Sequence, residues 1–183
     1  MNNKVVTNSS VIEAAFLKAK SQFKGLRKAP VSLIQKNISN STMRAQPTLF
    51  VEEGFNIKRG YKIEISFVSK IDNKTPTSDL PFDVLVGWFA HELGHVLDYH
   101  SRSSAEMVVF GIKYLISDTF KQKVERKADI LAIQNGFSEQ ILEAKKYILN
   151  HSDLNPLYKR RLEKYYYSIE DIEDIIVEKR ARE

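Results

Sequence analysis

The chain contains no cysteine among its 183 residues. The fold therefore has no disulfide bonds and no thiolate metal ligands, so any bound metal ion must be held by histidine and carboxylate side chains. The absence of cysteine suits a reducing compartment, and we expect a cytoplasmic protein.

Long hydrophobic runs are also absent. Residues 1–23 lack the continuous apolar segment of a secretion signal, and their apolar residues recur at helical spacing. The most apolar stretch, AEMVVFGIKYLI at residues 105–116, carries Glu106 and Lys113 and is shorter than the about 20 residues that span a membrane. We therefore expect no transmembrane segment. We interpret residues 105–116 as a buried helix, with a membrane-surface contact or a partner-binding face as the alternative.

Neither sign of charge dominates the chain. Lys and Arg number 28 and Asp and Glu 23, which gives a net charge of +5, but the two kinds are interspersed. The run YKRRLEKYYY at residues 158–167 combines bases with aromatics, as nucleic-acid-binding segments do. At helical spacing, however, Leu157, Arg161 and Tyr165 fall on the faces of an ordinary amphipathic helix. We expect a solvated surface and no nucleic-acid partner.

The length of the chain favours one domain of the α+β class. Hydrophobic periodicity and capping residues predict helices at residues 9–23, 82–99, 104–117, 120–134, 138–149, 156–166 and 169–180. Three β-branched or alternating segments, at residues 31–39, 43–51 and 61–69, predict strands, and residues 52–60 supply turn chemistry. We divide the single domain 1–183 into an N-terminal helix and strands (1–60), a core (61–136) and C-terminal helices (137–183).

The segment WFAHELGHVLDYH at residues 88–100 contains the pattern HExxH. His91 and His95 are four residues apart, so on a helix they project side by side and can hold one ion. Glu92 lies about 100° from His91, where it can reach a water on the metal without becoming a ligand. The pattern favours a zinc site with Glu92 as general base, and the alternative is a buried helix that carries these residues by chance.

A catalytic zinc site needs a third protein ligand. The extended pattern HExxHxxGxxH is excluded, because Asp98 and Ser101 stand where it requires glycine and histidine. Asp98 shares a face with His91 but lies nearly two turns further along the helix, and the segment VLDYH has no glycine or proline that would bend it. We expect Asp98 to accept hydrogen bonds near the site or at the helix end.

A better candidate is the segment VERKADILAIQNG at residues 124–136. Glu125 and Asp129 share one face of the predicted helix, and Ala128 between them is small enough for two helices to touch. One carboxylate can bind the metal while the other accepts the free N–H of a ligand histidine. We favour Glu125 as the ligand; the alternative is an exposed Glu and Asp on a solvated helix.

HELGH followed by ERKAD resembles the gluzincin clan of zinc metallopeptidases, and it is especially similar to the minigluzincins and to the soluble core of the CAAX-prenyl-protease-like branch. The resemblance covers about residues 61–136. It implies zinc ligands at His91, His95 and Glu125, a general base at Glu92, and Asp129 supporting a ligand histidine.

The same resemblance implies a zincin-like fold, in which a small sheet of about three strands packs on the active-site helix before a mostly helical C-terminal half. It also implies that YKIEISFVS, at residues 61–69, forms the upper rim of the cleft and pairs with an extended substrate. The membrane helices of the larger relatives are absent from the chain. The first 50 and last 45 residues match no motif of the group.

These features predict a zinc-dependent peptidase that acts on a peptide or protein substrate. No second donor for the oxyanion is evident from the sequence. His151, Tyr158, Arg160 and Arg161 in HSDLNPLYKRR, at residues 151–161, are candidates if this segment folds back over the cleft, and the alternative is that they are surface residues. A non-catalytic or latent module with the same fold is the alternative function.

The C-terminal segment SIEDIEDIIVEKR places Ile169, Ile172 and Ile176 on one stripe. We expect it to dock as an amphipathic helix. We also interpret it as a partial shield over the active site.

Overall fold

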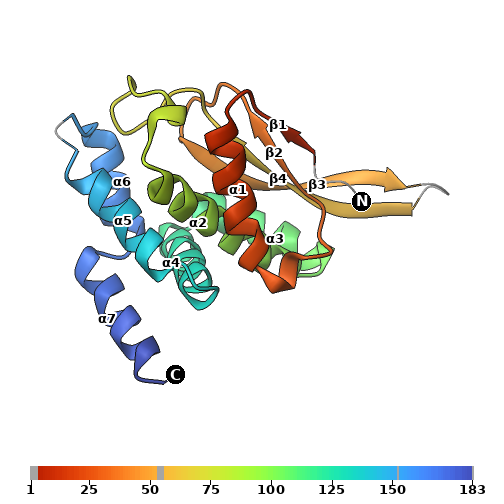
Figure 1. The fold of residues 1–183 in the computed structure, drawn as a ribbon. Coiled ribbons are helices and arrows are strands. Elements are labelled where there is room, and N and C mark those ends of the chain that lie inside the picture. Colours follow the sequence, from red (N-terminus) through yellow and green to blue (C-terminus); the bar gives the residue numbers. More distant parts are fainter. Residues whose placement is uncertain (1–3, 53–55, 152, 183) are drawn as a thin grey trace.

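The computed structural model describes residues 4–52, 56–151 and 153–182. The fold is α+β, with a mixed sheet from the N-terminal part of the chain and helices through the C-terminal half (Figure 1). The strands are β1 (Val5–Val6), β2 (Val31–Gln35), β3 (Met43–Glu52) and β4 (Asn56–Ile65). The helices are α1 (Ser10–Gln22), α2 (Phe82–His100), α3 (Ser104–Ile116), α4 (Asp118–Gln134), α5 (Ser138–Leu149), α6 (Pro156–Tyr165) and α7 (Ile169–Arg180).

The sheet has the strand order β1-β2-β4-β3. β1, β2 and β4 run parallel, and β3 pairs antiparallel with β4. The expected pairing of residues 61–69 with a substrate is therefore wrong for residues 61–65, because β4 has a strand on each side and β3 is an edge strand of the sheet. The expected turn at residues 52–60 is also partly wrong, because β4 already begins at Asn56.

Every α-helix in the described part of the chain lies where the sequence predicted one, with small differences at the ends. Serines cap several of them: Ser9 caps α1, Ser117 caps α4, and Ser103 and Ser168 form capping boxes on α3 and α7. Proline begins α6 at its first turn, where no backbone N–H is needed.

The core lies between the sheet and helices α1 and α2. Alternate residues of the strands, including Leu33, Ile63 and Ile65, are fully or nearly fully buried and belong to the same cluster as the α1 and α2 side chains. Phe16 of α1 meets Phe89 of α2 edge to face, with ring centroids 5.6 Å apart. α2 is thus held against the sheet along its apolar side.

Two glycines let other helices approach α2 closely. A Cβ on Gly94 would lie 2.5 Å from the carbonyl oxygen of Ala128 in α4, and a Cβ on Gly87 would lie 2.2 Å from the carbonyl oxygen of Gln140 in α5. The sequence predicted the small contact residue at Ala128. This contact sets α4 directly beside the HExxH turn of α2.

The prediction that residues 105–116 form a helix is confirmed, but the prediction that this helix is buried is wrong. The helix is present as α3, but only Phe110 of it is buried. Large aliphatic side chains along its length are exposed instead, including Leu115 at 84% and Ile116 at 78%. Among the described residues, no helix combines the length and hydrophobicity needed to cross a membrane.

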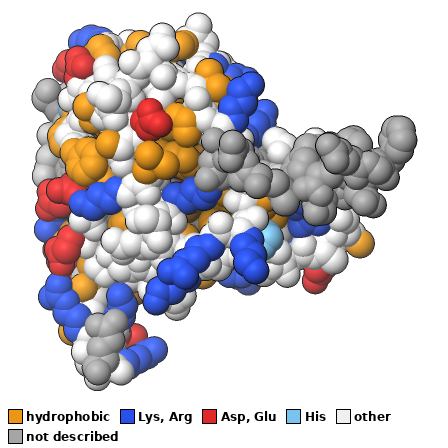
Figure 2. All heavy atoms as spheres, turned by 45° about the vertical axis from the view of Figure 1, so that its right-hand side comes forward, with side chains coloured by type: hydrophobic (Ala, Val, Ile, Leu, Met, Phe, Trp, Pro, Cys, Tyr) orange, Lys and Arg blue, Asp and Glu red, His pale blue; other side chains and the backbone are white. Residues whose placement is uncertain are grey.

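The charged surface is divided into separate groups. Figure 2 shows a face on which Lys and Arg side chains are separated by hydrophobic and uncharged surface. In the run at residues 158–167, Lys164 and the hydroxyl of Tyr165 both contact the Asp118 carboxylate at 2.6 Å, while Arg161 lines a pocket. The bases and aromatics of this run therefore do not share one solvent-facing surface.

Candidate metal centre

Two helices bring together the three residues predicted to bind metal. α2 presents His91 and His95 with their Nε2 atoms 3.1 Å apart, and α4 presents Glu125 with its Oε2 3.3 Å from each of them. For tetrahedral zinc with bonds of about 2.0–2.1 Å, neighbouring ligand atoms are about 3.3 Å apart. The donor set and its spacing therefore fit a zinc-sized ion.

Each of two residues in this cluster is oriented by a neighbour. Asp129 Oδ1 lies 2.7 Å from His91 Nδ1, where it can accept the Nδ1–H and leave Nε2 facing the cluster. Tyr114 of α3 donates its hydroxyl to Glu125 Oε1 at 2.5 Å, which leaves Oε2 facing the imidazoles. His95 Nδ1 is buried without a hydrogen-bond partner in the described part of the chain.

The cluster is buried, and its charges perturb one another strongly. Burial disfavours the charged imidazole of His91, but the carboxylates of Asp129 and Glu125 outweigh it and raise the pKa of His91 to about 10. Burial alone would raise the pKa of Glu125, but the imidazoles of His95 and His91 hold it well below its usual range. The site is thus built to hold positive charge between these groups.

Glu92 lies beside this cluster rather than in it. It is 8% exposed and borders the same pocket as His91, and burial raises the pKa of its carboxyl. A carboxylate with a raised pKa is a stronger base once it is deprotonated.

A pocket of about 100 Å³ opens beside His91 and Glu92. Its apolar wall comes from α2, α5 and α6 and includes Trp88, Ile148 and Leu162. Residues 41–43, just before and at the start of β3, close another side. The edge strand β3 therefore begins at the mouth of the site.

α6 folds back over this pocket, as the sequence suggested. Tyr158 and Arg161 line it, and Arg161 Nη1 donates to the carbonyl oxygen of Asn40 at 3.0 Å. Burial raises the pKa of Tyr158 to about 12, so its hydroxyl keeps its proton at neutral pH. The other two candidate donors lie elsewhere: His151 contacts Asp72 at 3.3 Å, and Arg160 is exposed.

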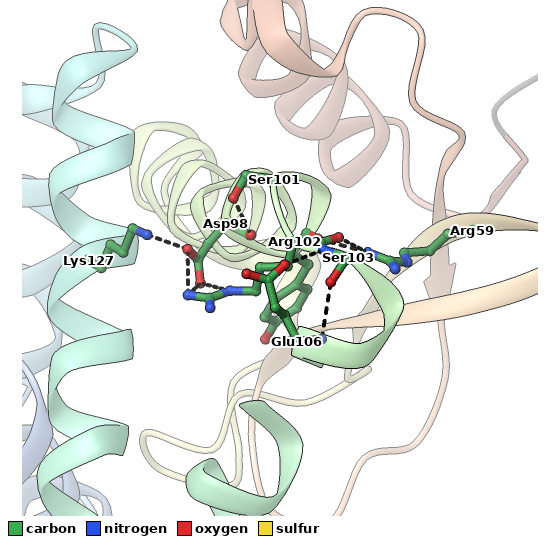
Figure 3. A network of polar contacts seen from close by, with 8 residues as sticks. Arg59, Asp98, Ser101, Arg102, Ser103, Glu106 and Lys127 are labelled. Carbon is green, nitrogen blue, oxygen red and sulfur yellow. Dashed lines mark hydrogen bonds and ion pairs between the residues drawn. The ribbon is translucent and has the colours of Figure 1, made fainter. Parts of the chain in front are cut away.

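Asp98 is not part of the metal cluster. It is buried and accepts hydrogen bonds from Nε and Nη2 of Arg102, four residues further along, and it also pairs with Lys127 of α4 (Figure 3). The prediction that Asp98 is a hydrogen-bond acceptor at the helix end is confirmed.

Sequence reasoning missed two aromatic residues of the site. Tyr114 orients Glu125, and the ring of Tyr166 lies 5.5 Å from the ring of His91. A tyrosine within the aliphatic helix 104–116 was a usable signal, because a buried hydroxyl needs a polar partner. The partner itself comes from another helix and could not be named in advance.

The C-terminal helix does not cover the pocket. α7 docks through buried Ile172 and Ile176, as predicted, and lies beside α5 on the side remote from the sheet (Figure 1). None of its described residues lines the pocket, which is bordered by α6 and Tyr166 instead. The interpretation of this helix as a shield is therefore wrong.

Comparisons of the chain with protein-family models, with curated proteins and with solved structures give no match. What the site does must therefore be argued from its own residues.

Proposed function

We propose that the protein is a zinc-dependent peptidase of the gluzincin type. The observation that carries the proposal is the arrangement of His91, His95 and Glu125, whose three ligand atoms lie 3.1–3.3 Å apart. Two neutral imidazoles and one carboxylate leave a fourth position for water, which is the ligand set of catalytic rather than structural zinc.

Zinc bound at these residues would acidify a water molecule and polarise the carbonyl of the scissile bond. Glu92 would take the proton of that water and pass it to the leaving amine. Its place next to His91 on α2 and its border on the pocket support this role. Because its carboxyl must be ionised to accept a proton, hydrolysis decreases as the pH falls through the pKa of Glu92.

Tyr158 and Arg161 are the candidates for stabilising the oxyanion. Both line the pocket beside Glu92, and both keep a proton to donate at neutral pH, since burial raises the pKa of Tyr158 and nearby acidic groups and phenols outweigh burial to raise that of Arg161. Tyr158 and Arg161 lie one turn apart on α6, so one helix places both donors.

An extended peptide is the substrate that this site suits. β3 is an edge strand of the sheet and begins at the pocket, so its backbone can pair with a substrate strand. The apolar wall of the pocket favours a hydrophobic side chain next to the cleaved bond.

The test compares Glu92→Gln with the wild type for zinc content and for cleavage of casein and a peptide library. The variant is expected to retain zinc and to lose hydrolysis, because glutamine keeps the shape of the side chain but cannot take a proton. Glu13→Gln on α1, an exposed position, is the matched control and should cleave like the wild type. Full activity of Glu92→Gln would remove Glu92 from the mechanism.

A latent or non-catalytic module is the second candidate. It is favoured by the burial of the ligands, since the side chains of His91, His95 and Glu125 are only 12%, 7% and 3% exposed beneath the α6 segment. Bound zinc without cleavage of any peptide by the wild type would support this second function.

A further inference from the structure

The outward face of α3 is a continuous aliphatic stripe. Its large side chains lie on one side of the helix and are 50–84% exposed: Val108, Val109, Ile112, Leu115 and Ile116. The opposite side of the helix packs on the protein through Met107, Phe110 and Tyr114. α3 is therefore apolar on both faces, and only one of them is covered.

The protein holds α3 firmly in this orientation. A capping box between Ser103 and Glu106 begins the helix (Figure 3). Arg59 reaches from β4 to the Ser104 hydroxyl at 2.9 Å. The helix ends at Ser117, whose side chain caps α4 directly. On the inner face, Tyr114 is bound to Glu125. The exposed stripe is thus a fixed surface and not a loosely attached segment.

The composition of the stripe fits a lipid surface better than a protein partner. Single exposed aliphatic residues are ordinary, but a contiguous apolar face marks an interaction site. Protein interfaces are enriched in aromatic residues and arginine and carry hydrogen bonds, whereas this stripe has only aliphatic side chains. The hydrocarbon of a bilayer can cover such a stripe without shape complementarity and without hydrogen bonds.

The charges beside the stripe are positive and are not neutralised by acidic groups. Lys113 of α3 and Lys121, whose ammonium group lies 5.3 Å from the centre of the Tyr114 ring, form no ion pair with any carboxylate among residues 4–52, 56–151 and 153–182. The two acidic residues of the same region are already engaged, Glu106 in its capping box and Asp118 with Lys164 and Tyr165. The surroundings of α3 therefore complement an anionic surface.

We propose that the outward face of α3 docks on an anionic phospholipid bilayer. The helix lies in the interface with its aliphatic stripe about 5–10 Å deep, and the lysines contact the headgroups. The helix does not span the bilayer, since its 13 residues are about 20 Å long. This binding is independent of metal and of hydrolysis.

The experiment is flotation of the full-length protein with vesicles of phosphatidylcholine alone or mixed with phosphatidylglycerol. The wild type should float with the mixed vesicles and much less with phosphatidylcholine. Ile112→Ser combined with Leu115→Ser should weaken binding at least about tenfold. Lys113→Gln should weaken it about fivefold, and only on the anionic vesicles.

The control is Leu157→Ser combined with Val177→Ser, which changes two exposed aliphatic residues of α6 and α7 and should bind like the wild type. Circular dichroism checks that every variant is folded. Failure of the wild type to float with anionic vesicles, or equal binding by the α3 variant, overturns the proposal. A dimer in solution that the α3 variant converts to a monomer, without vesicle binding by the wild type, assigns the face to a second copy and also overturns it.

Discussion

The two carboxylate oxygens of Glu125 make different contacts. Oε2 faces the two imidazoles and Oε1 accepts the Tyr114 hydroxyl. The side chain is therefore fixed in the direction of the metal cluster by a contact that involves no metal. Asp129 acts one step further out, through the ring of His91.

These positions predict a graded loss of zinc. Glu125→Ala should lose most zinc affinity because it removes a ligand atom, while Asp129→Ala should cost about 10–100-fold, as for other groups that orient a ligand. Asp98→Asn should change zinc affinity little, since Asp98 pairs with Arg102 and Lys127 instead. The measurement is zinc content after dialysis against a graded series of chelator.

Circular dichroism accompanies this series, because Asp98 is buried and its ion pairs stabilise the end of α2. If Asp98→Asn lost the metal and Glu125→Ala kept it, the assignment of the third ligand would be wrong.

At the scale of elements, the site depends on how closely α2 and α4 approach. Gly94→Ala would place a methyl group 2.5 Å from the carbonyl oxygen of Ala128, so the helices must separate. We expect a loss of about 1–3 kcal/mol in the free energy of unfolding, together with weaker zinc binding.

Gly111→Ala in α3 is the matched control, because its Cβ meets nothing within 4 Å. There the same substitution should stabilise by up to about 1 kcal/mol through helix propensity. Urea unfolding measures both variants. Equal effects of the two substitutions would show that the contact at Ala128 is not tight.

The sheet carries a second prediction at this scale. Glu64 is 1% exposed on the face of the sheet away from the helices, and it contacts Lys36, Arg44 and Lys62. Burial opposes the charge of this carboxyl, but the three cations outweigh it and lower its pKa to about 2. Its ionised form is therefore favoured more strongly in the folded than in the unfolded chain.

Because its pKa is lower in the folded chain, ionised Glu64 stabilises the fold. This contribution to the free energy of unfolding is fully present above the ordinary pKa of a glutamate and is lost as the pH falls toward 2. The contribution is about 3 kcal/mol at most. Glu64→Gln should be less stable than the wild type at neutral pH, and this difference should shrink steadily on acidification. Urea midpoints measured across the acid range test it; a difference independent of pH would contradict it.

The parts of the fold that local sequence determines were predictable. The 3.6-residue period and capping serines marked α1 to α7, and the HExxH spacing placed two histidines on one face. β1 was missed because two residues, Val5 and Val6, are too short to show alternation. The order of the strands depends on parallel pairing between distant segments, which no local pattern encodes.

The exposure of α3 was missed for a related reason. Apolar composition indicates that a helix packs against an apolar partner, but it does not indicate what that partner is. The protein covers the inner face of α3, whereas none of the described residues covers the outer face. The same limit applies to the C-terminal helix, whose stripe predicted docking but not the surface that it docks on.

At the scale of the whole molecule, the position of α7 decides what its removal does. Its buried residues Ile172 and Ile176 pack in the main core, and Lys179 donates to the carbonyl oxygen of Ile133 at the end of α4. Deleting residues 168–183 removes these contacts and exposes the α5 surface. We therefore expect a loss of several kcal/mol in stability, given about 1.5–3 kcal/mol for each buried isoleucine.

The same deletion should leave the activity of each folded molecule unchanged, because the pocket is closed by α6 and Tyr166, which remain. The measurement combines a thermal melt with the rate of peptide cleavage, normalised to the folded fraction at a temperature below the transition. A higher normalised rate in the truncated protein would restore the interpretation of α7 as a shield. A lower melting temperature with an unchanged normalised rate would assign α7 to stability alone, and access to the metal centre would then depend on the position of α6.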